Sequence, residues 1–284
     1  MAGIKPWTMR GGVAVVTGAA RGIGAALAAS LARRGMDLAL VDLNADGLAW
    51  TAAAARALGA KVSTHLLDVA DTAGTAALPD AVLAGHGRVT LLVNNAGVAL
   101  GGLFEQVAAE DFDWLMSINF GATVRLTRAF LPLLARAPAA QIVNVSSIFG
   151  IIAPPGQTAY AASKFAVRGF SESLRHELEM TNSPVGVTIV HPGGVRTSIA
   201  DNARLSKRLD PGDVARERAN WRGLLALSPE DAAECIARGI ERRAPRVIVG
   251  NDAKGAAWLQ RLFPVSYWKH AARDIARRVK KAAA

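Results

Sequence analysis

The feature that most limits the fold is a short apolar run that leads directly into a glycine-rich turn and then into a helical pattern. Residues 13–16 are all apolar, residues 17–24 read TGAARGIG, and the alanine- and leucine-rich stretch after them ends at Gly35. A tight turn, close approach of the backbone to a pyrophosphate and close packing of helix on strand are permitted by Gly18, Gly22 and Gly24. This order predicts a dinucleotide-binding α/β unit, although the spacing GxxxGxG also fits a plain structural turn.

Apolar and β-branched runs recur along the chain and are separated by segments with a helical pattern. The seven expected strands cover residues 13–16, 38–41, 61–66, 91–93, 141–145, 185–190 and 246–249. Strands that alternate with helices form a parallel sheet covered on both faces. We therefore expect an α/β fold, a single doubly wound Rossmann-fold domain over residues 1–250 with a seven-stranded parallel sheet. A helical C-terminal extension, residues 251–284, follows it. With 284 residues, of which 51% are hydrophobic, the chain is long enough to bury a substantial core.

An acidic residue ends the second expected strand. Asp42 lies eighteen residues after Gly24, where a carboxylate accepts hydrogen bonds from the adenosine ribose of NAD and repels the 2′-phosphate of NADP. Arg21, inside the glycine turn, favours the opposite choice because a guanidinium can pair with that phosphate. The placement of the carboxylate is the stronger constraint, so we expect NAD, with NADP as the alternative. A purely structural role for Asp42 would be to cap the next helix.

A tyrosine and a lysine stand four residues apart in a segment with the pattern of an opening helix. Tyr160 and Lys164 therefore share one helical face, where the ammonium is expected to lower the pKa of the phenol from about 10 toward the working range. Ser147 ends the β-branched run before this helix, and its hydroxyl can bond the substrate oxygen that Tyr160 would protonate. Exposed pairs of this kind are common on helices, so this pair gains weight only from the rest of the chain.

Polar residues also interrupt apolar surroundings elsewhere. A long helical pattern, residues 111–137, carries Asn119 in its interior; because asparagine is a mediocre helix former, we expect it to bind water or to distort the helix. An amide satisfied by local backbone is the alternative. The fourth strand ends in NNAG, residues 94–97, and the sixth in HPGGVRTS, residues 191–198. Two such strand ends on one sheet edge are what an α/β ligand crevice requires.

Together these motifs resemble the classical short-chain dehydrogenase/reductase family, with TGAARGIG, NNAG, Asn119, Ser147, YAASK and PGG in the family's order between residues 10 and 250. The resemblance implies a catalytic tetrad of Asn119, Ser147, Tyr160 and Lys164, with Ser146 as a supporting neighbour. The expected cofactor-binding residues are Gly18, Arg21, Gly22, Ile23, Gly24, Asp42, Asp68, Val69, Asn94, Asn95, Ala96, Gly97, Tyr160, Lys164, Pro192, Gly193, Val195 and Thr197.

The resemblance also implies a mechanism. Tyr160 would exchange a proton with the substrate oxygen, and Ser147 would stabilise the charge that develops on it. Lys164 would assist the phenol and bond the nicotinamide ribose, while Asn119 would anchor a water in a proton relay. The leading prediction is an NAD(P)-dependent oxidoreductase that transfers a hydride between the nicotinamide and a lipophilic secondary alcohol, ketone or aldehyde.

Two other functions stay open. An NADPH-dependent 3-oxoacyl-thioester reductase would use Arg21 for the 2′-phosphate and a basic surface for an acidic carrier protein, and cofactor preference separates it from the leading prediction. A nucleotide-sensing or nucleic-acid-binding module would use the basic tail. Such a module has no need of Tyr160 beside Lys164.

Residues beyond the strand ends are mostly apolar, which indicates a lipophilic substrate. The candidate pocket residues are Val98, Phe104, Ile148, Phe149, Ile152 and Gln157. Residues 199–228 are polar, without a clear period and long for a loop, so we expect a lid over the binding edge.

The chain is strongly basic, with a net charge of +10 and a pI near 10.4. This indicates an anionic partner: a nucleotide, an acidic carrier, a membrane surface or, least expected, nucleic acid. The tail after Gly250 mixes aromatic and aliphatic side chains with cations in the manner of interfacial helices. Packing on its own domain or on a neighbouring subunit is favoured over membrane contact, because Pro264 interrupts a long amphipathic helix.

The remaining features limit partners and location. Cys235 is the single cysteine, and the five histidines show no ligand spacing, so no metal site and no intramolecular disulfide are expected. Neither a secretory signal nor an apolar run of the ~20 residues that span a bilayer is evident, which favours the cytoplasm, with peripheral membrane attachment through the tail as an addition. The family resemblance implies a homodimer or homotetramer formed through the helix that contains Arg125 and the helix after Tyr160.

Overall fold

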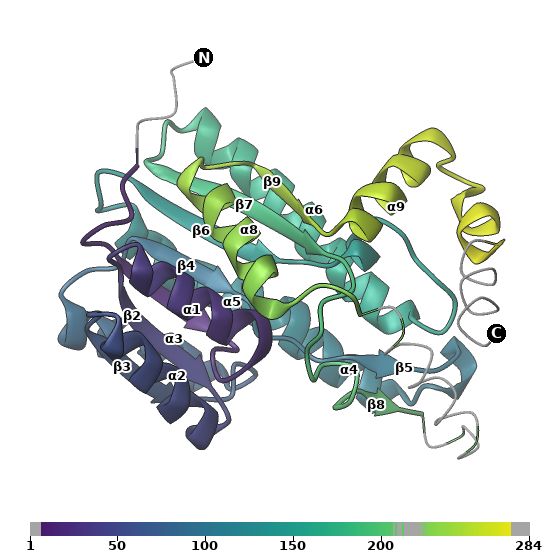
Figure 1. The fold of residues 1–284 in the computed structure, drawn as a ribbon, viewed down its shortest axis with the longest axis horizontal. Coiled ribbons are helices and arrows are strands. Elements are labelled where there is room, and N and C mark those ends of the chain that lie inside the picture. Colours follow the sequence, from purple (N-terminus) through teal and green to yellow (C-terminus); the bar gives the residue numbers. More distant parts are fainter. Residues whose placement is uncertain (1–6, 207, 209–211, 213–222, 224, 274–284) are drawn as a thin grey trace.

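The computed structural model describes residues 7–206, 208, 212, 223 and 225–273. Its centre is a seven-stranded parallel sheet in the order β3-β2-β1-β4-β6-β7-β9, with helices on both faces (Figure 1). The strands are β1 Val13–Thr17, β2 Asp37–Asp42, β3 Val62–Leu66, β4 Leu91–Asn94, β6 Ala140–Val145, β7 Val185–Pro192 and β9 Arg246–Val249. This confirms the predicted doubly wound Rossmann fold, and every expected strand agrees within two residues at either end. The strand order reverses between β1 and β4, which places the ligand crevice of such a sheet there.

The helices divide between the two faces of the sheet. They are α1 Gly22–Arg33, α2 Ala45–Ala57, α3 Thr72–His86, α4 Ala109–Met116, α5 Ala122–Leu134, α6 Thr158–Met180, α8 Pro229–Glu241 and α9 Asn251–Leu262. Side chains of α1, α2 and α8 share one buried cluster, whereas those of α3, α5 and α6 share the cluster on the opposite face. Successive residues of β1 alternate between the clusters, since Val16 belongs to the first and Val15 to the second.

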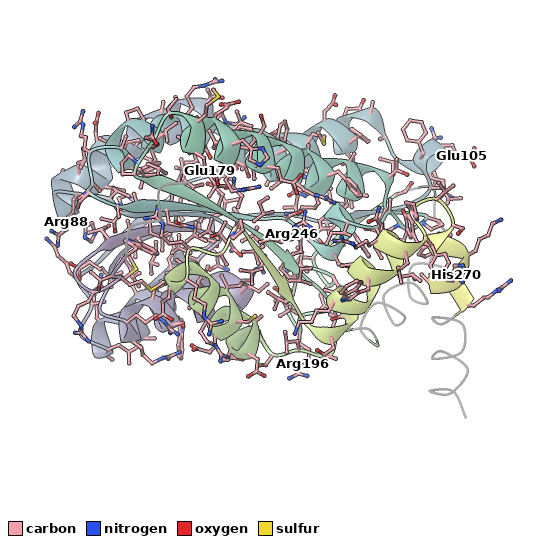
Figure 2. The ribbon with its side chains drawn as sticks, turned by 90° about the horizontal axis from the view of Figure 1, so that it is seen from above. Arg88, Glu105, Glu179, Arg196, Arg246 and His270 are labelled. Carbon is pink, nitrogen blue, oxygen red and sulfur yellow. The ribbon has the colours of Figure 1, made fainter. Side chains whose placement is uncertain are left out.

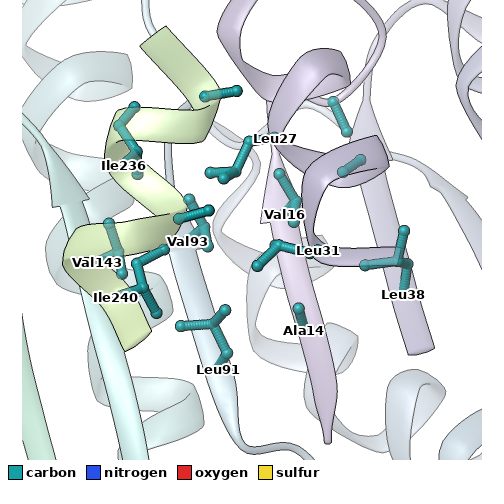
Figure 3. Packing of buried hydrophobic residues seen from close by; sticks show 14 of the residues in the cluster. Ala14, Val16, Leu27, Leu31, Leu38, Leu91, Val93, Val143, Ile236 and Ile240 are labelled. Atoms are coloured by element: carbon teal, nitrogen blue, oxygen red, sulfur yellow. The ribbon is translucent and has the colours of Figure 1, made fainter. Parts of the chain in front are cut away.

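The core on the α1 and α8 face is formed by aliphatic side chains (Figure 3). Leu27 and Leu31 of α1 meet Ile236 and Ile240 of α8 above the sheet, and all four are fully buried. Burying one such side chain contributes about 1.5–3 kcal/mol. Beyond the core, Arg34 pairs with Glu234 at 2.7 Å and with Glu241 at 2.9 Å, so the end of α1 is tied to α8.

Helix starts follow the capping residues in the sequence. Asn44 caps α2 by accepting from Gly47 N at 2.8 Å, and Ser228 caps α8 by accepting from Asp231 N at 3.0 Å, with Pro229 in the first turn. The N-cap of α2 is therefore Asn44, and Asp42 does not have the capping role that was its structural alternative.

Three features add to the expected strands and helices. A second, two-stranded parallel sheet pairs β5 Leu100–Gly101 with β8 Arg204–Leu205; segments of two residues carry no periodic signal. The helical pattern at 111–137 is two helices joined by a π-helical segment, Ser117–Gly121, around Asn119. A 3₁₀ turn, η3 Ile148–Gly150, follows Ser147.

The described part of the C-terminal extension, residues 251–273, lies at one end of the molecule (Figure 1). After α9 the chain turns at residues 264–266 and is helical again over residues 267–273. Half of the expected lid at 199–228, and the tail from residue 274, lie outside the described residues. None of the helices in the described ranges combines the length and hydropathy needed to span a bilayer.

Candidate active site

The glycine turn folds closely on itself between β1 and α1. Gly18 and Gly22 have φ of +65° and +56°, in the left-handed region that favours glycine. A Cβ at Gly24 would lie 2.0 Å from the carbonyl oxygen of Gly18, so only glycine fits where the helix crosses the turn. A Cβ at Gly22 would lie 3.0 Å from the Thr197 side chain, which shows that the first and sixth expected strand ends meet here.

The NNAG motif braces the strand ends, as predicted. Asn95 Nδ2 donates to Thr17 O at 2.9 Å, and Thr17 Oγ1 accepts from the backbone N–H groups of Asn95 and Ala96, both at 3.0 Å. Asn94 is buried and donates to Asn144 Oδ1 at 2.8 Å, toward the sheet. The Asn94 side chain thus links β4 to β6, and the expectation that this residue flanks the cofactor stays a prediction.

A cleft of about 520 Å³ opens at the carboxyl ends of the strands. Eleven predicted cofactor residues line it: Gly18, Arg21, Gly22, Ile23, Asp42, Asp68, Val69, Asn95, Ala96, Gly97 and Thr197. Val98, predicted for the substrate pocket, also lines it. Ser198 of the HPGGVRTS motif and Ile199 and Asn202 of the expected lid segment line it as well. The lining residues that the sequence did not single out are Leu43, Asn44, Leu67, Ala99 and Ile118. The predicted cofactor residues that do not line this cleft are Gly24, Asn94, Tyr160, Lys164, Pro192, Gly193 and Val195.

The Asp42 carboxylate is fixed at the edge of the cleft. Its Oδ2 accepts from Ala20 N at 3.0 Å, and its Oδ1 accepts from Asn44 N at 3.0 Å. The residue is half-buried, and one backbone donor from the glycine turn and one from the segment before α2 hold it where it lines the cleft with Gly18 and Arg21.

Ser147, Tyr160 and Lys164 meet where β6 and α6 approach each other. Lys164 is 3% exposed, its Nζ donates to Val145 O at 3.1 Å, and Nζ lies 5.6 Å from the centroid of the Tyr160 ring. The Tyr160 phenol shares a hydrogen bond with the Ser147 side chain. Ser146 supports this arrangement, since its hydroxyl donates to the Lys164 carbonyl at 2.9 Å.

Burial decides the pKa values of the two ionisable groups. It raises the pKa of the Tyr160 phenol to about 12, against the lowering effect of the Ser147 hydrogen bond, and it lowers the pKa of Lys164 to about 8. The phenol pKa thus moves in the direction opposite to the one predicted from the Tyr/Lys spacing. The reason is that loss of water destabilises the phenolate and the ammonium alike.

Asn119 lies beside Lys164 and is 1% exposed. A Cβ at Gly97 would lie 3.3 Å from Asn119 Oδ1 and 3.4 Å from Lys164 Nζ, so both side chains face the same glycine. Asn119 Oδ1 accepts from Val98 N at 2.8 Å, and Nδ2 donates to Val98 O at 3.0 Å and to Ser163 Oγ at 3.1 Å. The predicted distortion of the helix at Asn119 is confirmed. The alternative, that the backbone satisfies the amide, also holds in part, but the backbone is that of Val98 in the loop after β4 and not that of the helix itself.

The expected substrate-pocket residues separate into two groups. Phe149 packs edge-on against the Tyr160 ring with centroids 6.1 Å apart, and Ile152 and Gln157 are buried in the loop between Ser147 and α6. Ile148 belongs to η3, next to Ser147. Phe104, in contrast, is 70% exposed.

His191 is a residue of this site that the sequence analysis missed. Its ring is fully buried at the carboxyl end of β7, and Nδ1 donates to the Ser147 carbonyl at 2.9 Å. Burial lowers its pKa to about 4, so the imidazole is neutral with its proton on Nδ1. The signal was its place directly before PGG, at the end of an apolar strand.

Three comparisons place this site among known proteins. The family model for short chain dehydrogenases matches residues 12–208. The chain is 43% identical over 270 residues to the Mycobacterium tuberculosis protein SadH, whose name describes it provisionally as an oxidoreductase. This match covers 95% of this chain and 97% of SadH. The chain is 35% identical over 207 residues, 71% of each chain, to the CLA biosynthesis dehydrogenase/reductase of Lactiplantibacillus plantarum.

Solved structures agree with these matches. A short chain dehydrogenase/reductase from Burkholderia phymatum in complex with NAD superimposes with a TM-score of 0.84 at 33% identity, covering 90% of this chain and 95% of that one. A metagenomic short-chain oxidoreductase in complex with NADP gives a TM-score of 0.69 at 31% identity, covering 86% and 98%. With the family model spanning more than half of its length, this chain belongs to the short-chain dehydrogenase/reductase family of oxidoreductases.

Proposed function

We propose that the protein transfers a hydride between a nicotinamide cofactor and a lipophilic secondary alcohol, ketone or aldehyde. The observation that carries this proposal is the meeting of Ser147, Tyr160 and Lys164 beside a cleft lined by the glycine turn. The cleft fits a dinucleotide because Gly18 and Gly22 line it with bare backbone, packed closely against Ala96 and Thr197, so that a pyrophosphate can approach the turn. The solved relatives in complex with NAD and NADP support the same cofactor class.

Each residue then has a chemical role. Tyr160 gives a proton to the substrate oxygen in reduction and takes it in oxidation, and Ser147 donates to that oxygen as charge develops. With a pKa of about 8, Lys164 is mostly charged at pH 7 and favours the phenolate. Asn119 holds the loop after β4 against α6, beside Lys164. When bound, the nicotinamide supplies or accepts the hydride.

The decisive test replaces the proton donor. In Tyr160→Phe we expect turnover to fall by about 10²–10⁴-fold, the usual contribution of a general acid or base, while the melting temperature and NADH affinity remain near wild type. Turnover is measured with alcohols, ketones and aldehydes of increasing apolar size and with each of the two cofactors. The readout is the absorbance of the reduced nicotinamide. Near-normal turnover in Tyr160→Phe would disprove the assigned role.

We also propose that the protein prefers NAD, on the strength of the fixed Asp42 carboxylate at the cleft edge. Titration with NADH and NADPH, followed by tryptophan fluorescence, measures the preference. Asp42→Ala should weaken NADH binding by about 10-fold or more, because hydrogen bonds to a charged group are lost. The difference in affinity between NADH and NADPH should therefore become smaller. Asp80→Ala, an exposed carboxylate on α3, is the matched control. Equal affinities in wild type would contradict the preference.

A 3-oxoacyl-thioester reductase using NADPH is the second candidate function. It is favoured by one observation, the position of Arg21 on the wall of the same cleft as Asp42. Tight NADPH binding that is lost in Arg21→Ala, together with reduction of acyl thioesters, would support it over the first. A nucleotide-sensing or nucleic-acid-binding role would require neither Tyr160 nor Lys164, and turnover with any substrate excludes it as the sole function.

For partners, we propose self-association through α5 and α6 and contact of the C-terminal extension with an anionic membrane surface. On α9 and the following turn, Trp258, Leu262, Phe263 and Val265 are 64%, 66%, 42% and 94% exposed. Lys254 and Arg261 lie on the same helical face as Trp258. Exposed apolar side chains interleaved with cations are typical of an interfacial helix.

Vesicle pelleting and light scattering test these two partners together. Trp258→Glu and Arg261→Glu should reduce binding to phosphatidylglycerol vesicles at low salt. Trp50→Glu on α2 and Arg88→Glu, at the opposite end from His270 (Figure 2), should leave it unchanged. Absence of pelleting by wild type would overturn the membrane proposal. A fall in molecular mass caused by Trp258→Glu would assign the same surface to a subunit interface instead.

A further inference from the structure

The described part of the C-terminal extension, residues 251–273, reaches the candidate active site through two hydrogen bonds. Asp252 Oδ2 accepts from Gly194 N at 2.7 Å, and the Tyr267 hydroxyl accepts from Ala153 N at 3.0 Å. Gly194 belongs to the loop after β7, and Ala153 to the loop between Ser147 and Tyr160. The two contacts therefore lie on different sides of the site, and both come from a segment outside the residues that the family model matches.

The Asp252 contact is built into the backbone of both segments. Gly250 has φ of +99° and turns the chain from β9 into α9, which places Asp252 in the first helical turn. A Cβ at Gly193 would lie 2.3 Å from the Asp252 carboxylate, so a side chain here would displace that carboxylate from its present position. Ala253, next to Asp252, is fully buried and fixes the start of the helix. Gly193, predicted to contact the cofactor, thus makes room for Asp252.

The contact between Asp252 and Gly194 affects the wall of the cofactor cleft. Thr197 lies three residues after Gly194 and lines the cleft, where it meets Gly22 of the glycine turn. Holding the Gly194 amide therefore limits how far the Thr197 wall of the cleft can move.

The Tyr267 contact affects the loop between Ser147 and Tyr160, on the proposed substrate side of the site. Ala153 is six residues after Ser147 and seven before Tyr160, in the loop that carries the buried Ile152. Trp268, the neighbour of Tyr267, lines a surface groove of about 600 Å³ together with Ala153 and residues of α6. The Ala153 amide is thus bound by a side chain 114 residues away rather than by its own loop.

We propose that the C-terminal extension positions both borders of the active site, with Asp252 acting on the cofactor side and Tyr267 on the substrate side. The inference rests on the proposed oxidoreductase function, but its structural part is measurable without turnover. Asp252 and Tyr267 are positioning residues, since each acts through a backbone amide of a loop.

The first experiment measures hydrogen exchange of the full-length protein by mass spectrometry. Tyr267→Phe removes only the hydroxyl and should speed exchange in peptides around Ala153 by about fivefold, the effect of losing one net hydrogen bond. Asp252→Ala should do the same around Gly194 and not around Ala153. Asp252→Asn keeps an acceptor oxygen and should restore slow exchange. Glu230→Ala removes an exposed first-turn carboxylate from the neighbouring α8 and should change neither region.

The second experiment separates the two sides kinetically. Tyr267→Phe should raise KM for the alcohol or ketone by about fivefold with an unchanged Kd for NADH, and Asp252→Ala should raise that Kd by a similar factor. Exchange and kinetics in both variants equal to those of Glu230→Ala would overturn the inference. If wild type turns over no substrate while exchange changes as expected, the positioning stands and the proposed function fails.

Discussion

At the residue scale, the side chains proposed to react are held through backbone carbonyls as much as through their own polar atoms. The Ser147 carbonyl accepts from His191 Nδ1 at 2.9 Å and from Gly150 N at 2.9 Å, so these two bonds fix the backbone of the serine without using its hydroxyl. The Lys164 carbonyl accepts from the Ser146 hydroxyl in the same way. Such contacts fix where a hydroxyl or an ammonium points without using the group that reacts.

His191 offers a test of this positioning. His191→Leu removes the buried donor, so we expect the free energy of unfolding to fall by about 1–3 kcal/mol and turnover to fall further than cofactor affinity. His191→Asn retains an N–H at a similar distance from the backbone and should recover most of both. Denaturant unfolding and steady-state kinetics provide the two readouts. If the Leu and Asn variants behave alike, the donor has no role beyond filling space.

At the element scale, the unit β1–turn–α1 depends on how closely the helix crosses the turn. The contact between Gly24 and the Gly18 carbonyl leaves no room for a methyl group, because a Cβ would lie 2.0 Å from that oxygen. The π-helical segment Ser117–Gly121 has a comparable role on the other face, since it directs the Asn119 amide at the Val98 backbone and at Ser163. Irregular backbone thus occurs where the cleft requires it.

Gly24→Ala should therefore destabilise the protein by about 1–3 kcal/mol, the usual cost of overpacking, and weaken NADH binding. Gly255 in α9 is the matched control, because a Cβ there would meet nothing within 4 Å. Gly255→Ala should leave stability unchanged or raise it by up to about 1 kcal/mol. Thermal unfolding and a fluorescence titration distinguish the two, and equal effects would refute the close-crossing argument.

At the scale of the whole molecule, burial controls ionisation. His191 and Lys164 both sit in the packed edge of the sheet, and burial shifts the pKa of each toward the neutral form. For His191 the folded-state pKa is about 4, below the ordinary value of 6.5. As the pH falls below 6.5, His191 binds a proton in the unfolded chain but not in the folded protein. The free energy of unfolding therefore decreases until His191 is also protonated in the folded protein, near pH 4.

This linkage predicts a pH dependence of stability. Between pH 7 and pH 5 the His191 contribution should fall by about 2 kcal/mol, so wild type should lose that much more stability than His191→Asn. Burial also lowers the pKa of His65 and His86, and these effects cancel in the comparison because both proteins retain them. His176→Asn, at an exposed position on α6, is the control. Parallel pH profiles for wild type and His191→Asn would contradict the prediction.

The sequence by itself determined the order of strands and helices, the glycine turn and the fourfold spacing of Tyr160 and Lys164. These features are local: strand and helix periodicity, left-handed glycines and i,i+4 geometry all arise within a few neighbouring residues. The same reasoning placed Asp42 on the cleft, since parallel strands deliver their ends to one edge of the sheet, whereas Thr197 was expected there from the family resemblance.

Only the tertiary structure decided the contacts between segments and the ionisation of the site. The bonds from His191 to Ser147, from Asp252 to Gly194 and from Tyr267 to Ala153 join residues 44, 58 and 114 positions apart. Single polar residues of this kind leave no periodic trace in a sequence. The direction of the Tyr160 pKa shift was likewise missed, because spacing reveals a neighbouring cation whereas desolvation depends on everything packed around the phenol.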